Sequence, residues 1–264
     1  MLIGDLTIVD RFASCRSLGI GGSWRLSTRL AVLNGSKRGV ASSFTVQRKV
    51  YKSTRRKSEN AMYKFESIYR QLLLSSMMGT DRVTQEELAR RCNVSLGLVN
   101  KTIRKLSLTL AVEATSQGVR VLSPGRVLNL WATERNVDKD LLDSFRLDDL
   151  RETERSLPSG VVMTAFSAWK SLSGKAPAEY DRLYFYVIDQ ARFKDWVRFR
   201  EPQRRSTNPN IFALITGDKH LTETAVNSVA CVPQVYVDIY SVDGPPATPY
   251  LRDIIESYPQ FSIW

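Results

Sequence analysis

The sequence predicts an α+β protein in which a winged helix-turn-helix domain is followed by a mixed α/β domain. Three observations lead to this prediction. Residues 62–108 contain three segments with apolar residues at helical spacing, and two short alternating runs joined by a turn come after them. Beyond residue 160, strand-like and helix-like apolar runs succeed one another. The first 61 residues show no sustained period, so we expect a basic and flexible N-terminal segment.

The N-terminal segment, residues 1–61, carries most of the positive charge. It holds 12 Lys and Arg against three acidic residues, a net charge of +9, whereas the whole chain has +11. Three interpretations stay open. The segment is an arm that neutralises nucleic-acid phosphates, a targeting leader rich in Arg and Ser, or an extension from a start codon assigned upstream of Met62. Asp5 and Asp10 argue against a leader, because such leaders are poor in acidic residues.

The helix-turn-helix is predicted within residues 84–108. Thr84 is placed to cap the first helix, and Glu87, three residues on, completes the pattern of a capping box. Asn93 ends the first helix and Ser95 is placed to cap the second. The second helix has an apolar stripe on one side, and its other side carries three positive charges and no acidic residue.

The segments on either side complete the pattern of a winged helix. Residues 62–78 form an apolar helix before the pair, and residues 108–114 and 118–122 read as two strands of a hairpin. Pro124 then opens a further helix that runs to about Arg135. The order helix, helix, helix, hairpin is typical of winged helix-turn-helix domains, to which we assign residues 62–136.

The outer side of the second helix and the hairpin turn supply the candidate DNA-binding residues. An Asn side chain can bond an adenine edge, and Lys and Arg can reach guanine or phosphates. The open alternatives are a helical hairpin with a merely solvated basic face, and a winged helix that binds protein. The candidates are Ser95, Leu96, Gly97, Asn100, Lys101, Arg104 and Lys105 on the helix, with Gln117 and Arg120 at the hairpin.

Residues 137–264 are assigned to the second domain. Its first part, up to about residue 160, is acidic and helix-prone and ends in a Pro- and Gly-containing turn. Strands then alternate with helices, which is typical of α/β or α+β domains. The predicted elements are a buried helix over 161–172, strands over 182–188, 210–216 and 234–242, and helices over 193–199 and 250–258.

The candidate catalytic groups are few. His220 is the only histidine, lies beside Asp218 in a turn, and is expected at the surface, so the pattern of a catalytic triad has no support. Asp189, Asp218 and Asp238 lie at or just after predicted strands, where carboxylates can bind a metal. The Gly-Ser and Asp-x-Asp pattern of nucleotidyl transfer is absent, and we expect Asp238 to bond backbone in the following turn. We therefore expect no catalytic activity, no metal and no cofactor.

Cysteine usage and hydropathy bear on the compartment. Cys15, Cys92 and Cys231 are scattered and form no CxxC pair, so neither a disulfide framework nor a zinc site is predicted. Cys92 has the pattern of a small core residue. No apolar run approaches the roughly 18 residues that span a bilayer, so we expect a soluble, cytoplasmic protein with no membrane partner.

Several stretches of residues 62–258 resemble the AbiEi-type antitoxins of type IV toxin–antitoxin systems. The resemblance is carried by SPGRVLNLWA after the hairpin, by MTAFSAW before LYFYV, and by NIFALIT followed by GDKHL. Its most discriminating part is the string Pro-Gln-x-Tyr-x-Asp in CVPQVYVDIY. The chain departs from the family at DGPPATPY, where the family has a Gly-rich turn, and residues 1–61 lie outside the resemblance.

This resemblance implies a sequence-specific transcriptional regulator that binds double-stranded DNA and regulates its own gene. It also implies a cognate nucleotidyltransferase-like toxin that the chain neutralises. A homodimer is compatible with the sequence. The alternative function is a protein-interaction module, toxin-neutralising or scaffolding, whose winged helix binds protein rather than DNA.

Overall fold

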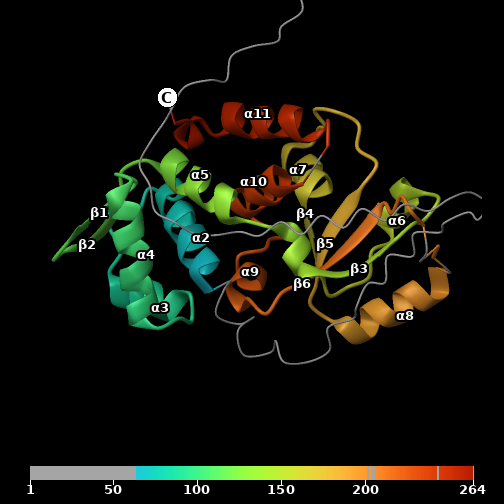
Figure 1. The fold of residues 1–264 in the computed structure, drawn as a ribbon, viewed down its shortest axis with the longest axis horizontal. Coiled ribbons are helices and arrows are strands. Elements are labelled where there is room, and N and C mark those ends of the chain that lie inside the picture. Colours follow the sequence, from blue (N-terminus) through green and yellow to red (C-terminus); the bar gives the residue numbers. More distant parts are fainter. Residues whose placement is uncertain (1–63, 201, 204–205, 243, 264) are drawn as a thin grey trace, which may run out of the picture. The chain divides into compact units, whose positions relative to one another are not determined.

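The computed structural model describes residues 64–200, 202–203, 206–242 and 244–263, which form helices and two small β-sheets (Figure 1). The protein is α+β, as predicted. The expectation of a flexible segment over residues 1–61 concerns residues outside the described part. Within that part, no helix combines the length and the apolar character needed to cross a membrane.

The N-terminal half of the described residues contains four helices and a hairpin. Helices α2, α3 and α4 precede the two-stranded antiparallel sheet, and α5 follows it. The element bounds are α2 (Lys64–Met77), α3 (Gln85–Arg91), α4 (Leu96–Leu108), β1 (Val112–Thr115), β2 (Gly118–Val121) and α5 (Pro124–Glu134).

The short helices of this half begin and end where the sequence predicts. The Thr84 hydroxyl accepts a hydrogen bond from the Glu87 backbone N–H at 3.1 Å, and Ser95 caps α4 in the same way through the N–H of Leu98. The reciprocal half of the predicted capping box gives way to an ion pair, because the Glu87 carboxylate lies 2.5 Å from a guanidinium nitrogen of Arg91. Asn93 turns the chain between α3 and α4 with a φ of 51°.

The hairpin is joined to the segment before α3. Val83 and Val119 exchange backbone hydrogen bonds of 3.0 and 2.8 Å, so Val83 pairs with the edge of β2. Gly118 begins β2 at a φ of 125°, and a Cβ there would lie 2.9 Å from the Val83 carbonyl oxygen. Only glycine suits this position, because both the backbone conformation and the available space exclude a side chain.

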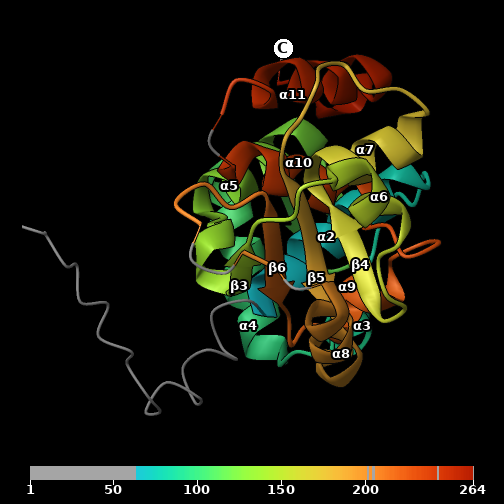
Figure 2. The same cartoon turned by 90° about the vertical axis from the view of Figure 1, so that its right-hand side faces the viewer.

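The C-terminal half is built on a four-stranded sheet of order β3-β6-β5-β4 (Figure 2). The two central strands are parallel, and each edge strand is antiparallel to its neighbour. The element bounds are η1 (Val137–Asp140), β3 (Leu141–Phe145), α6 (Leu150–Arg155), β4 (Val161–Thr164), α7 (Ala165–Ser173), β5 (Leu183–Val187), α8 (Gln190–Arg200), β6 (Ile211–Ile215), α9 (Lys219–Glu223), α10 (Val232–Ser241), α11 (Ala247–Ser257) and η2 (Pro259–Phe261).

Both faces of the sheet are covered. Along β5, Tyr184 and Tyr186 face the larger core, whereas Phe185 and Val187 face a smaller core that includes Phe193 of α8. This explains why β5 reads as a continuous apolar run rather than an alternating one. Figure 1 shows α10 lying between α5 and α7, on the side of the larger core.

The larger core is continuous between the two halves of the chain. It includes Leu72 of α2, Val99 of α4, Trp131 of α5, Tyr186 of β5 and Tyr250 of α11. Residues of both halves therefore exclude water from one shared interior. The predicted domain division at 136/137 falls between α5 and η1 and stays a prediction.

Three predictions for the C-terminal half are wrong in whole or in part. The strand predicted over 234–242 is helix α10, with Pro233 in its first turn. Its apolar residues alternate as in a strand. The helix is buried nearly all round, however, so the spacing of its apolar residues could not distinguish a helix from a strand. The helix predicted over 161–172 is divided into β4 and α7, with Ala165 at a φ of 53° between them. The helix-prone stretch after 137 contains helix α6, as expected, but also the edge strand β3.

Candidate nucleic-acid interface and the polar network behind it

The predicted contact residues of the second helix lie together on the outer side of α4. Those from Ser95 to Lys105 are all exposed, whereas Val99, Ile103 and Leu106 face the core. The spacing of the apolar residues was therefore enough to predict which side of α4 is exposed, because α4 packs on one side only.

The polar groups of this face differ in how they are held. Lys101 and Arg104 make no ion pair or hydrogen bond with any other residue that the structure describes. The Asn100 side-chain amide donates to the Leu96 carbonyl oxygen at 3.2 Å, one helical turn back. Lys105 is paired with the Glu134 carboxylate of α5, so its charge is compensated within the protein. Free positive charge is thus concentrated at Lys101 and Arg104.

Of the two predicted hairpin residues, Arg120 is held by an acidic neighbour that the sequence did not reveal. Gln117 is exposed at the turn. Arg120 lies directly across the two strands from Glu113, and its guanidinium is 3.2 Å from the Glu113 carboxylate. Arg82, before α3, reaches the same carboxylate at 3.5 Å and donates to the Thr115 hydroxyl at 2.9 Å. The antiparallel register is the signal that could have revealed the Glu113–Arg120 pair.

Behind this surface, two buried arginines organise a polar network inside the shared core. The first is Arg135, at the C-terminal end of α5 and 6% exposed. Its Nε donates to Asp238 at 2.8 Å and its Nη2 to the Tyr186 hydroxyl at 2.8 Å. Its Nη1 lies 2.6 Å from Asp140 and 3.5 Å from Glu66. One guanidinium therefore connects α2, α5, η1, β5 and α10.

Asp238 has a different role from the predicted one. Its carboxylate accepts hydrogen bonds from the hydroxyls of Thr164 and Tyr186, both at 2.6 Å, as well as from Arg135. The expectation of a bond to turn backbone is wrong, because the residue lies within a buried helix rather than in a strand that leads into a turn. Burial of a carboxylate requires such partners.

The second arginine is Arg70 of α2, which is 1% exposed. Its Nε and Nη2 donate to the Gln234 side-chain oxygen at 3.1 and 2.7 Å, and its Nη1 forms a 2.7 Å ion pair with Asp218. The Gln234 amide nitrogen in turn donates to Asp238 and to the Tyr186 hydroxyl, each at 3.0 Å. Gln234 therefore joins the two arginine clusters into one network.

His220 belongs to this network, and the expectation that it lies at the surface is wrong. It is 4% exposed, with Nδ1 3.1 Å from Arg70 and Nε2 3.0 Å from the Gln71 side-chain oxygen. A guanidinium only donates, so Nδ1 is the acceptor and Nε2 carries the proton that Gln71 accepts. Burial, assisted by the charge of Arg70, lowers the pKa of His220 from 6.5 to about 4. The imidazole is thus neutral at pH 7.

Glu66 shows the opposite shift. Burial raises the pKa of its carboxyl from 4.5 to about 7, and the nearby Arg135 guanidinium only partly opposes this effect. The network therefore contains one carboxyl that titrates near neutral pH and one histidine that does not.

The other candidate chemical groups have structural partners. Asp189 accepts hydrogen bonds from the backbone N–H groups of Ala191 and Arg192 at the start of α8. The Cys92 thiol is buried as predicted and donates to the Ser67 carbonyl oxygen at 3.2 Å, and burial raises its pKa to about 11. Over residues 64–263, with their gaps, no group of three or more His, Cys, Asp and Glu side chains is arranged to hold a metal ion.

The chain was compared with known families, sequences and folds. It matches no family model, no curated protein and no solved structure.

Proposed function

We propose that the chain is a sequence-specific, DNA-binding transcriptional regulator, with a winged helix-turn-helix formed by α2 to β2. The observation that carries this proposal is the outer side of α4. It presents Asn100 together with the unpaired Lys101 and Arg104, and α4 contains no acidic residue. A helix that packs on one side and offers donors and positive charge on the other is suited to the major groove.

The proposed roles follow from how each side chain is held. Asn100 reads a base edge after giving up its bond to the Leu96 carbonyl, a weak intrahelical bond that costs little to lose. Lys101 reaches base edges, and Arg104 neutralises phosphates. Lys105 serves chiefly to fix α4 against α5 through Glu134.

The hairpin acts as the wing in this proposal. Gln117 and Arg120 contact the minor groove or the backbone of the DNA. Because Glu113 competes with phosphate for Arg120, Arg120 contributes less affinity than an unpaired arginine would. Ser95, Leu96 and Gly97, at the start of α4, allow the backbone to approach the DNA closely.

The resemblance to AbiEi-type antitoxins extends the proposal to autoregulation and to neutralisation of a nucleotidyltransferase-like toxin in the cytoplasm. The Pro-Gln-x-Tyr-x-Asp string contributes to this proposal only through the fold. Gln234 and Asp238 are buried in the network, so they are unavailable to a partner.

The proposal is tested by selection of bound sequences from a random double-stranded DNA library with the full-length chain. We expect one enriched motif. Its recurrence as an inverted repeat upstream of the chain's own gene would support autoregulation. Recovery of DNA without any enriched motif would contradict sequence-specific binding.

A second candidate function is a protein-interaction module, which one observation favours. Three leucines are exposed at the junction of α4 and the hairpin: Leu108 is 81%, Leu110 65% and Leu122 48% accessible. Exposed apolar side chains that lie together are common at protein interfaces. Loss of self-association in Leu110→Asp, for a chain whose DNA selection enriches no motif, would favour this function over DNA binding.

A further inference from the structure

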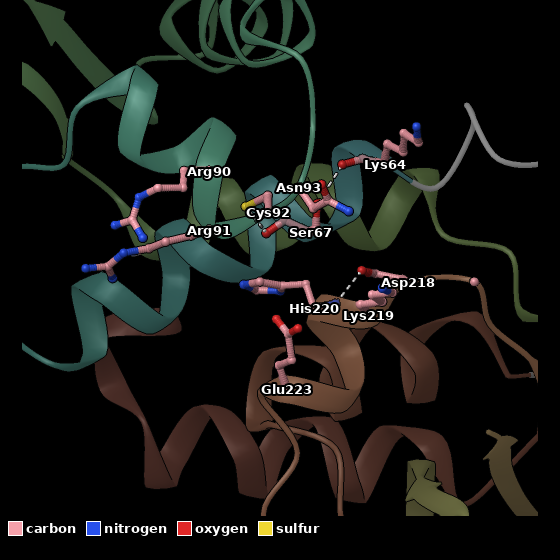
Figure 3. Close-up of a pocket in the computed structure, with 11 residues that line it drawn as sticks. Lys64, Ser67, Arg90, Arg91, Cys92, Asn93, Asp218, Lys219, His220 and Glu223 are labelled. Atoms are coloured by element: carbon pink, nitrogen blue, oxygen red, sulfur yellow. Dashed lines mark hydrogen bonds between the residues drawn. The ribbon is translucent and has the colours of Figure 1, made fainter. Parts of the chain in front are cut away.

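A cavity of about 380 Å³ lies beneath the turn that joins α3 to α4 (Figure 3). Its walls come from three separated parts of the chain: the start of α2, the end of α3, and residues 217–223 around α9. This volume is at the small end of the range that binds small molecules, roughly 300–1,000 Å³. The cavity is distinct from the outer side of α4.

Positive charge predominates in the cavity. Four cationic side chains line it, from Lys64 on α2, Arg90 and Arg91 on α3, and Lys219 on α9 (Figure 3). Lys64 and Lys219 make no ion pair with any other described residue, and Arg90 reaches Glu87 only at 4.0 Å. Arg91 is the exception, since it pairs closely with Glu87.

The acidic and polar groups of the cavity leave this charge uncompensated. Both Asp218 oxygens are occupied, one by Arg70 at 2.7 Å and the other by the His220 backbone N–H at 3.0 Å. The His220 ring is neutral and held by Arg70 and Gln71. Glu223 is the one lining acid that makes no ion pair within the described residues.

We propose that this cavity binds a small phosphate-bearing molecule. The four cations come from three elements around the cavity, and a phosphate group carries a double charge and several oxygens that such cations can pair with. An ionised carboxylate only accepts hydrogen bonds, so Glu223 is matched by a hydroxyl or amino group elsewhere on the same ligand. The ligand class is therefore a compact molecule with a phosphate at one end and a hydrogen-bond donor at the other.

A ligand here would also contact the turn that sets the angle between α3 and α4. Asn93, with its φ of 51°, lines the cavity. Occupancy would bias the position of α4, and bound DNA would change the ligand affinity by the same factor. This regulatory part, unlike the binding itself, rests on the proposed DNA-binding function.

The binding is tested without DNA, by calorimetric titration of the full-length chain with inorganic phosphate at constant ionic strength, with potassium chloride as the reference salt. Lys219→Gln should weaken phosphate binding roughly tenfold, as loss of one charge-assisted contact implies. Glu223→Gln should strengthen it, because a repelling charge is removed. Lys194→Gln on α8 is the matched control, an exposed lysine outside the cavity, and should change nothing.

The opposite signs expected for Lys219→Gln and Glu223→Gln exclude unfolding as the cause. Equal heats for phosphate and chloride, or equal effects of Lys219→Gln and Lys194→Gln, would overturn the proposal. If Lys219→Gln instead leaves phosphate binding unchanged and weakens DNA binding, the cavity residues contact DNA and the ligand site is wrong. Failure of the DNA selection leaves the phosphate titration unaffected, so the two proposals fail separately.

Discussion

Arg70 on α2 donates two hydrogen bonds to the side-chain oxygen of Gln234 on α10, 164 positions further along the chain. Gln234 also donates to Tyr186 and Asp238, which bind the second buried arginine, Arg135. Helices α2 and α5, which lie next to α4, are therefore held to the C-terminal half by paired, desolvated charges. Such a network is costly to break on one side, because the remaining partner is left buried without compensation.

Replacing Gln234 by Ala should destabilise the fold strongly. The change leaves part of the Arg70 guanidinium without its acceptor and creates a small cavity, so we expect a loss of about 3 kcal/mol in the free energy of unfolding. Urea denaturation measures it. Gln117→Ala, an exposed residue of the same type, is the control and should stay within about 0.5 kcal/mol of the unaltered protein. Equal stability of the two variants would contradict the linking role of Gln234.

The stability of the protein should depend on pH through His220. Its folded pKa of about 4 lies below the ordinary 6.5, so the unfolded chain binds more protons between these values. The contribution of His220 to the free energy of unfolding is fully present above pH 6.5 and is lost as the pH falls towards 4. Arg70, Asp218 and Gln71 face the ring.

Glu66 acts in the opposite direction over an overlapping range. Its folded pKa of about 7 lies above the ordinary 4.5, so its contribution is present below pH 4.5 and is lost as the pH rises through 7. The free energy of unfolding should therefore be measured against pH in two variants. In Glu66→Gln, the increase in this free energy between pH 4 and 6.5 that is due to His220 appears without the opposing effect of Glu66. In Glu66→Gln combined with His220→Gln, this increase should be absent. If the free energy of unfolding increases with pH equally steeply in both variants, His220 is not the source of the pH dependence.

Replacing Asn100 by Ala should weaken binding to the selected DNA motif by about 1–3 kcal/mol and relax the base preference at one position. The reason is that Asn100 is the exposed amide of α4 and can bond an adenine edge. Asn136→Ala is the matched control, an exposed Asn whose side chain makes no capping bond. An unchanged base preference after repeating the selection would rule out this role.

Replacing Arg120 by Ala should weaken binding to all DNA sequences alike and lower the salt slope by about one unit, because one phosphate contact is lost. Glu113→Gln should have the opposite effect, since it frees Arg120 and Arg82 from the shared carboxylate. Filter binding at several salt concentrations measures both. An affinity loss confined to the selected motif would show that Arg120 reads bases instead.

Removing residues 1–61, so that the chain starts at Met62, should reduce non-specific DNA affinity and flatten its salt dependence. The removed segment carries +9 of the net charge, and such contacts are indifferent to sequence. Preference for the selected motif should survive, because base contacts specify and phosphate contacts position. Identical salt slopes before and after removal would favour a targeting leader or an upstream start codon. Aggregation of the shortened chain would mean that the segment supports the fold.

The sequence by itself predicted those features that depend on residues a few positions apart. Thr84 and Ser95 are caps, and Pro124 begins a helix, because each acts on backbone within one turn. The outer side of α4 could be identified for the same reason. Helix spacing determines which residues share a side, and Val99, Ile103 and Leu106 were enough to show which side packs.

Only the tertiary structure decided the features that depend on distant partners. Residues 232–241 alternate like a strand, yet they form a helix because neighbours from α2, α5 and α7 bury them from several sides. His220 reads as a surface residue until Arg70, 150 positions away, comes within 3.1 Å of its ring. The physical reason is that burial raises the free-energy cost of any unpaired polar group, so the fold places partners where local sequence gives no sign of them.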